Sequence, residues 1–157
     1  MKTLLLSLIM FITLISAPKA NEFNCLVEAV YHEARSEGLA GMLSVAGVIL
    51  TRVQNDNYPN TVCEVVHQGK KWNGHIIKHK CQFSYYCDGR SEKYKDMNSL
   101  TEVIKVVHMS LLGIQVKQTV GSTHYHASHV TPNWASDPQF KCLGQLGSHV
   151  FYIDTRS

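Results

Sequence analysis

The fold of this 157-residue chain depends most on residues 24–53, which read NCLVEAVYHEARSEGLAGMLSVAGVILTRV. Apolar side chains recur at helical spacing on both sides of a break at 36–38. The spacing predicts one helix over 25–35, capped by Asn24, and a second over 39–53. Two consecutive helices with apolar stripes indicate a core built mainly from helices.

Farther along the chain, two capping signals and several short runs predict smaller elements. Thr61 and Glu64 have the spacing of a capping box, which predicts a short helix over 62–68. Ser99 and Glu102 repeat that spacing at the start of a further helix. The other expected elements are a basic loop over 69–80 and short strands over 82–86, 123–126 and 149–153. Helices combined with a minor β part predict an α+β fold with a small helical core.

Residues 1–20 differ in character from the rest of the chain. A lysine at the second position precedes an apolar run over 4–17, and small residues follow up to Ala20. This order is typical of a secretory signal peptide, and the run is short for a transmembrane helix. We expect residues 1–20 to be a signal peptide, or an uncleaved anchor that would be the only membrane contact. Residues 21–157 are then one exported domain in the periplasm, cell wall or extracellular space.

The charge of the chain argues against nucleic acid as a partner. The formal charge is +3, from fifteen basic and twelve acidic residues. Lys2 and Lys19 lie in the expected signal peptide, so residues 21–157 hold thirteen basic residues against twelve acidic ones. A nearly neutral domain lacks the basic surface that binds phosphate backbones.

All five cysteines lie after the expected signal peptide: Cys25, Cys63, Cys81, Cys87 and Cys142. An exported chain keeps disulfides, and five cysteines allow at most two of them. The sequence leaves the pairing open, and we expect a bridge between Cys63 and the loop from Cys81 to Cys87. The C-x-x-C spacing that favours a metal site does not occur.

Glu33 lies on the apolar face of the first predicted helix. At about 100° per residue, it falls between Val30 and Ala29 on the helical wheel, whereas Glu28 and Arg35 fall on the opposite, solvated side. Burial disfavours the charged form of a carboxyl and raises its pKa, as the protonation of a glycosidic oxygen requires. A structural role in a buried ion pair is the alternative interpretation.

Five blocks of sequence are distinctive as a set. In chain order they read CLVEAVYHEARSEG with VAGVILTRV (25–38 and 45–53), TVCEVV (61–66), QFSYYCDG (82–89), THYHA with PNW (123–127 and 132–134) and GSHVFY (147–152). Together they resemble the catalytic domain of the SleB-type, spore-cortex-lytic cell-wall hydrolase family. The chain departs from the family's pattern in the length of its basic loop at 69–80.

The resemblance implies an enzyme that cleaves the glycan strands of peptidoglycan, as a muramidase or a lytic transglycosylase. It implies an α+β fold with a lysozyme-like catalytic helix, and it places the catalytic acid of the family's Glu-Ala-Arg-x-Glu motif at Glu33. Peptidoglycan is then the expected partner. We expect no cofactor and a monomeric protein.

The sequence leaves the participation of a second carboxylate open. A two-carboxylate hydrolase needs one across the scissile bond, and Glu37 and Asp88 are the candidates. A lytic transglycosylase needs none, because the sugar's own 6-hydroxyl attacks while Glu33 acts first as acid and then as base. We favour this single-acid scheme.

Candidates for sugar binding come from the same blocks. Aromatic faces for sugar rings and polar groups for hydroxyls are expected from Tyr31, Gln82, Ser84, Tyr85, His124, Tyr125, His126 and Trp134. For the aromatic residues, packing in the core is the alternative interpretation. The basic loop at 69–80 is either a solvated loop or a contact for anionic wall polymer.

Three further interpretations remain open at this stage. His124, His126 and His129 offer nitrogens for zinc, but the sequence shows neither a further ligand nor a general base, so we expect no metal. A wall amidase or peptidase would need a free thiol, for which Cys25 is the candidate. A non-catalytic wall-binding protein would leave Glu33 as a structural acid.

Overall fold

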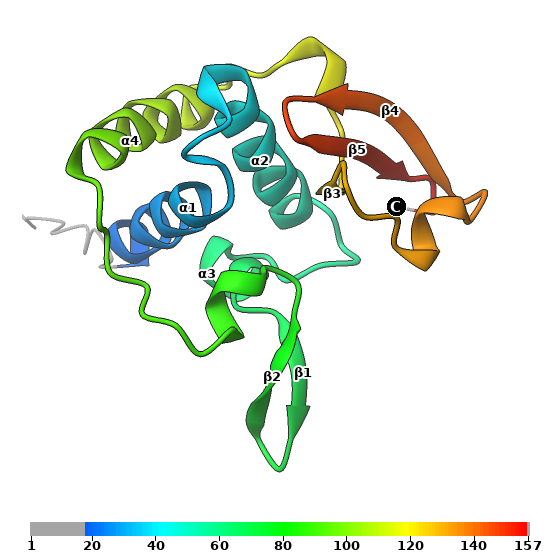
Figure 1. Cartoon of the computed structure of the whole chain (residues 1–157), viewed down its shortest axis with the longest axis horizontal. Helices are drawn as coiled ribbons and strands as arrows, with labels where there is room; N and C mark the ends of the chain where they lie inside the picture. The colour runs from blue at the N-terminus through cyan, green and yellow to red at the C-terminus, as the bar shows by residue number, and fades with distance from the viewer. Residues whose placement is uncertain (1–17, 157) are drawn as a thin grey trace, which may run out of the picture.

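The computed structural model describes residues 18–156, with side chains from residue 21 onward. Within that range the chain has the expected α+β fold, with four α-helices and two small antiparallel sheets (Figure 1). In chain order the elements are α1 Pro18–Ala34, α2 Gly38–Val53, α3 Val62–Val66, β1 Gly69–Trp72, β2 His75–Cys81, the 3-10 turn η1 Ser84–Cys87, α4 Met97–Leu111, η2 Lys117–Thr119, β3 His124–Ala127, η3 Asn133–Ser136, β4 Phe140–Leu146 and β5 His149–Asp154. The expected signal peptide lies almost entirely outside the described residues and stays a prediction.

The core lies between the helices, and α2 is at its centre. Val45, Ala46, Val48 and Ile49 have no exposed surface, although they point to different sides of this helix. Each fully buried side chain of the size of valine or isoleucine contributes about 2 kcal/mol to folding. No helix in the described part of the chain is long and apolar enough to cross a bilayer.

Helix α1 is longer than predicted. Its described part already includes residues 18–23, so Asn24 lies inside the helix and the prediction of Asn24 as its cap is wrong. The chain leaves α1 after Ala34, and Gly38 takes a left-handed conformation with φ of 68°, which confirms the predicted break. Glu33 consequently lies on the last turn of α1.

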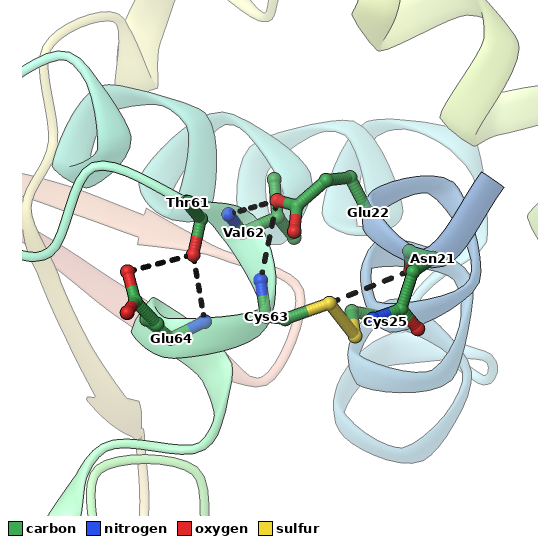
Figure 2. Close-up of a disulfide and its surroundings, with 7 residues drawn as sticks. All are labelled: Asn21, Glu22, Cys25, Thr61, Val62, Cys63 and Glu64. Carbon is green, nitrogen blue, oxygen red and sulfur yellow. Dashed lines mark hydrogen bonds between the residues drawn. A yellow bond between two sulfur atoms is a disulfide. The ribbon is translucent and has the colours of Figure 1, made fainter. Parts of the chain in front are cut away.

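A disulfide joins α1 to α3, between Cys25 and Cys63 (Figure 2). Beside it, the Glu22 carboxylate accepts hydrogen bonds from the first two N–H groups of α3. Figure 2 also shows the predicted cap, in which Thr61 accepts from the Glu64 N–H at 3.2 Å. Together these contacts fix a helix that is too short to be stable by itself.

The second disulfide joins Cys81 and Cys87, so the expected bridge from Cys63 to this loop is wrong. The Cα atoms of the bonded pair lie 6.1 Å apart, whereas a five-residue strand spans about 17 Å. The closed loop holds the 3-10 turn η1, and the strand predicted over 82–86 is wrong for this reason. Cys142 is free and exposed.

Residues 69–80, predicted as a loop, form most of the hairpin β1–β2, which stands out from the helical body (Figure 1). Asn73 and Gly74 have φ of 48° and 82°, the left-handed pair that closes a two-residue hairpin turn. Asn-Gly is a strong hairpin signal, so the pattern was present in the sequence. We call residues 69–81 the basic hairpin.

Helix α4 is capped by Asp96, whose Oδ1 accepts from the N–H groups of Asn98 and Ser99 at 3.0 and 3.1 Å. The capping box predicted at Ser99 and Glu102 is wrong, because Ser99 donates its hydroxyl to Asp96. Glu102 instead forms a surface ion pair with Lys105. The helix itself was predicted, and only its start differs.

The three-stranded sheet has the order β3–β5–β4 and is antiparallel throughout. Strands β3 and β5 confirm the predictions over 123–126 and 149–153. Strand β4 was not predicted, because a bulge between Cys142 and Gly144 interrupts its alternation.

Three polar contacts fix this sheet and the segment before it against the first two helices. They are Ser44 Oγ to Thr119 Oγ1 at 2.8 Å, Arg52 Nε to the Thr123 carbonyl at 2.7 Å, and the Glu37 carboxylate to the Ser148 N–H at 2.8 Å. The contacts place β3 beside the end of α1, where Glu33 lies.

Candidate active site

Glu33 and Ser84 line two neighbouring pockets. The first, of about 430 Å³, includes residues 81–84 and strand β3, and we call it the sheet-side pocket. The second, of about 320 Å³, includes the end of α1 and parts of 84–95, and we call it the helix-side pocket. Because Glu33 lines both, a polymer that occupied both pockets would contact this residue.

Burial raises the pKa of Glu33 above its ordinary value of 4.5, since desolvation penalises the charged form. Three hydrogen bonds act in the opposite direction. The Tyr125 hydroxyl donates to Oε2 at 3.0 Å, and backbone groups of Tyr85 and Ser84 also lower the pKa. The balance favours the protonated acid, while the same donors can stabilise the carboxylate that forms when the proton leaves.

Arg35 and Glu28, which the helical wheel places on the solvated side, differ in their exposure. Arg35 is exposed, with its guanidinium 4.8 Å from the Tyr31 ring. Glu28 is half-buried, so its predicted full solvation is wrong. Its charge adds to burial in raising the pKa of Tyr85, which therefore stays a neutral phenol.

Trp134 packs among the histidines of the sheet-side pocket. Its ring lies 5.3 Å from that of His124 and 5.6 Å from that of His126. Burial, and then the charge of Arg52, lower the pKa of His124 to about 4, so this ring is neutral at ordinary pH. The pocket therefore offers the indole ring of Trp134 beside a neutral imidazole at His124, which suit a sugar ring and its hydroxyl groups.

The hydrogen bonds of His126 define its tautomer. Its Nδ1 lies 2.9 Å from the Ala127 carbonyl, which can only accept, so Nδ1 carries the proton. Its Nε2 lies 3.0 Å from the Tyr152 hydroxyl and accepts from it when the ring is neutral. His126 is thereby held rigidly in the wall of the pocket.

All the residues predicted for catalysis and sugar binding line at least one of the two pockets. The sheet-side pocket includes Glu33, Gln82, Ser84, His124, Tyr125, His126 and Trp134, and the helix-side pocket includes Glu33, Tyr31, Ser84 and Tyr85. Tyr31 and Tyr85 are only 2% and 7% exposed. The Tyr31 hydroxyl accepts from the backbone of Lys95 and Asp96, so the structure favours packing roles for these two rings.

The two candidate second carboxylates lie in different places. Glu37 lines neither pocket and is bonded to Ser148, whose hydroxyl and N–H hold the Glu37 pKa below 4.5. Asp88 lines the helix-side pocket with Glu33. Its carboxylate also accepts from the Arg90 N–H at 2.7 Å, as in an Asx turn. The geometry therefore leaves Asp88 as the candidate with access to the site.

The three histidines considered for zinc do not form one cluster. His124 and His126 line the sheet-side pocket, but His129 is exposed and does not line it. Within residues 18–156, no three His, Cys, Asp or Glu side chains gather closely enough to hold a metal ion.

The cysteine nucleophile considered as an alternative is contradicted for Cys25. Its sulfur is bonded to Cys63 and the residue is buried. The free thiol is that of Cys142 on β4, outside the two pockets that contain Glu33.

Arg52 and His149 also line the sheet-side pocket and were not predicted. Arg52 is 4% exposed, and its guanidinium lies over the rings of Tyr58 and Phe83. The sequence contains no clear signal for Arg52, since basic residues are common in the last turn of a helix and are usually exposed there. The same is true of His149, whose place depends on the pairing of β5.

The cell wall hydrolase family matches residues 36–152, which are most of the chain, so the chain belongs to this family. The match begins three residues after Glu33 and does not itself cover that side chain. In fold, the chain is similar to the crystal structure of the catalytic domain of SleB from Bacillus cereus, with a TM-score of 0.58 and 23% identity over 85% of this chain and 90% of that one. It is also similar to the catalytic domain of the germination-specific lytic transglycosylase SleB from Bacillus anthracis, with a TM-score of 0.63 and 26% identity over 84% of this chain and 93% of that one.

Curated relatives include spore cortex-lytic enzymes. One from Halalkalibacterium halodurans is 26% identical over 133 residues, which are 83% of this chain and 34% of the relative. That of Bacillus subtilis is 40% identical over 48 residues, 31% of this chain and 16% of the relative. The aligned residues thus span about a third or less of the length of these relatives.

Proposed function

We propose that residues 21–157 cleave the glycan strands of peptidoglycan, with Glu33 as general acid and then general base. The observation that carries the proposal is a half-buried carboxyl group with a raised pKa at the junction of two pockets, held by the Tyr125 hydroxyl. Membership of the cell wall hydrolase family and the likeness to a lytic transglycosylase domain support the choice of substrate.

In this mechanism a single residue, Glu33, first donates a proton and later takes one back. Protonated Glu33 gives its proton to the glycosidic oxygen as the C1–O bond breaks, which leaves an alcohol on one fragment and a carboxylate on Glu33. The carboxylate then takes the proton of the 6-hydroxyl of the cleaved muramyl residue while that oxygen bonds to C1. An anhydro ring forms, Glu33 is protonated again and no water is consumed.

Tyr125 acts at the stage when Glu33 is a carboxylate. Its hydroxyl donates to Oε2 of Glu33 and stabilises the anion between the two proton transfers. Burial acts at the start of the cycle, because it keeps the proton on the acid until a sugar oxygen takes it.

We also propose that the domain works outside the cytoplasm. Two disulfides lie in the described residues, and such bonds persist in oxidising compartments. The expected signal peptide at 1–20 supports the same location.

Mass spectrometry of digested cell wall tests the function. In ¹⁸O-labelled water, the wild type is expected to release fragments with anhydro-muramyl ends that carry no label. Glu33→Gln should release at least about 100-fold fewer fragments, the scale of effect of a general acid. Glu37→Gln is the matched control, because it makes the same change outside both pockets.

Other outcomes are equally informative. Labelled reducing ends would show hydrolysis and overturn the single-acid scheme, and Asp88→Asn would then test the second carboxylate. Normal digestion by Glu33→Gln would remove Glu33 from the chemistry and overturn the proposal.

A further inference from the structure

A third pocket, of about 870 Å³, lies between the loop that joins α2 to α3 and the basic hairpin. We call it the hairpin pocket. Its lining includes Tyr58 and Asn60 from the loop, His67 just after α3, Lys71 from β1 and Tyr86 from η1. It is larger than either pocket beside Glu33, and its volume is in the range of sites that bind small organic ligands.

The lining of the hairpin pocket suits a ligand rich in hydroxyl groups. The rings of His67 and Tyr86 stack at 4.0 Å with 19° between their planes, and both residues are half-buried. Four side-chain amides also line the pocket: Gln54, Asn55, Asn60 and Gln68. Amides donate and accept hydrogen bonds, as hydroxyl groups do. Aromatic rings next to amides are the combination expected for a saccharide.

The charges of the hairpin pocket argue against a polyanion. Asp56 and Glu64 line it together with a single cation, Lys71. A phosphate polymer or an anionic lipid surface would meet two carboxylates there. Sugar hydroxyls can donate to those carboxylates, and Lys71 can pair with an occasional carboxylate along a glycan, such as the lactyl group of a muramyl residue.

Tyr58 connects the hairpin pocket to the active-site region. Its ring lies 6.4 Å from that of His124, and the Arg52 guanidinium lies 5.1 Å from its centroid. His124 and Arg52 both line the sheet-side pocket. Tyr58 thus lines the hairpin pocket while it packs against residues of the sheet-side pocket, so the two pockets are neighbours.

We propose that the hairpin pocket is an accessory binding site for the glycan strand, some sugars away from the bond broken at Glu33. The identity of the polymer rests on the proposed function. A second segment bound at the hairpin pocket raises the local concentration of the strand at the first site, so the domain favours long strands over short fragments.

The test measures binding by the double variant His67→Ala/Lys71→Ala in a Glu33→Gln background, which prevents cleavage. The probes are long glycan strands freed of their peptides and short fragments that reach only the pockets beside Glu33. We expect about tenfold weaker binding of the long strands, the size of one lost charge-assisted contact, and unchanged binding of the short ones. Because Lys71 is exposed, Lys71→Ala alone repeats the test without disturbing the His67–Tyr86 stack.

Lys80→Ala is the matched control, since it removes an exposed charge from the basic hairpin outside the pocket. Normal binding of long strands by the double variant at an unchanged melting temperature would overturn the accessory site. An equal loss with Lys80→Ala would also overturn it and indicate attraction to the whole hairpin. Failure of the proposed function is seen separately: the protein with Glu33 intact would then bind these strands through the hairpin pocket but would not cleave them.

Discussion

Tyr125 and Glu33 are separated by 92 residues in the sequence, yet their side chains share one hydrogen bond at 3.0 Å. The helical wheel predicts that Glu33 is buried, because that depends only on local spacing. The donor to its carboxyl group was not predictable, since it depends on the packing of β3 against α1. In the same way, the sequence indicates which aromatic residues lie near the active site, but not which of them are buried in the core. Tyr31 was predicted to bind sugar and is buried.

Removal of the Tyr125 hydroxyl should change the pH profile in a defined direction. That hydrogen bond favours the charged form of Glu33, so Tyr125→Phe raises the Glu33 pKa further. The first step needs the protonated acid, and the fall in activity on the alkaline side should therefore move to higher pH. The turnover at the optimum should fall about tenfold or more, because the anion loses a donor.

A series of kcat measurements against pH, with the variant and the wild type in parallel, checks this expectation. An alkaline limb that stayed in place or moved to lower pH would show that Tyr125 does not act on the Glu33 proton.

At the scale of elements, most of the helices and two strands of the larger sheet follow from local pattern. The failed predictions have more than one origin: the hairpin at 69–81 had a local signal in Asn73 and Gly74, whereas segment 82–86 depends on a covalent bond that its composition does not indicate. The strand over 82–86 was predicted from its composition, but the Cys81–Cys87 disulfide closes that segment into a turn. Cysteine pairing is fixed by the folded arrangement rather than by spacing, and here it overrides the local β preference.

The two disulfides should contribute unequally to stability. Cys25 and Cys63 are 38 residues apart, whereas Cys81 and Cys87 are six apart. Loop-closure entropy predicts a cost of about 4 kcal/mol for losing the first bridge and about 2 kcal/mol for the second. Urea unfolding of the two paired Cys→Ser variants measures the difference, with Cys142→Ser as the control, and a larger loss from the shorter loop would contradict the expectation.

The bond between Glu37 and Ser148 joins the α1–α2 corner to the turn between β4 and β5. Because this bond lowers the Glu37 pKa, its contribution to stability is complete above the ordinary value of 4.5 and is lost as pH falls through the lower folded value. Glu37→Gln should therefore be less stable than wild type by about 1 kcal/mol at neutral pH. The two proteins should converge at low pH, and a difference that grew on acidification would contradict this account.

At the scale of the whole molecule, the site exists only where the helical part meets the three-stranded sheet. Glu33 comes from the helices, whereas Tyr125, His124 and His126 come from the sheet. The sequence predicted both parts and the overall class. It did not predict how they join, because that join depends on the single buried contacts Ser44–Thr119 and Arg52–Thr123.

Arg52 should hold the two parts together. Its Nε donates to the Thr123 carbonyl at 2.7 Å, directly before β3. Arg52→Met keeps the apolar part of the side chain but loses this charge-assisted bond, so we expect a loss of about 2 kcal/mol in stability. Hydrogen exchange should show faster opening of β3 than of α2, and uniform exchange across both elements would contradict a joining role.

The central claim is that Glu33 holds its proton where an ordinary glutamate has lost it. A carbon-13 titration of the glutamate side-chain carboxyl groups by NMR, with Glu33→Gln used to assign the signal, tests it most directly. The account predicts that Glu33 titrates above 4.5 and Glu37 below it in the same experiment. A Glu33 signal that titrates at or below 4.5 would contradict the account.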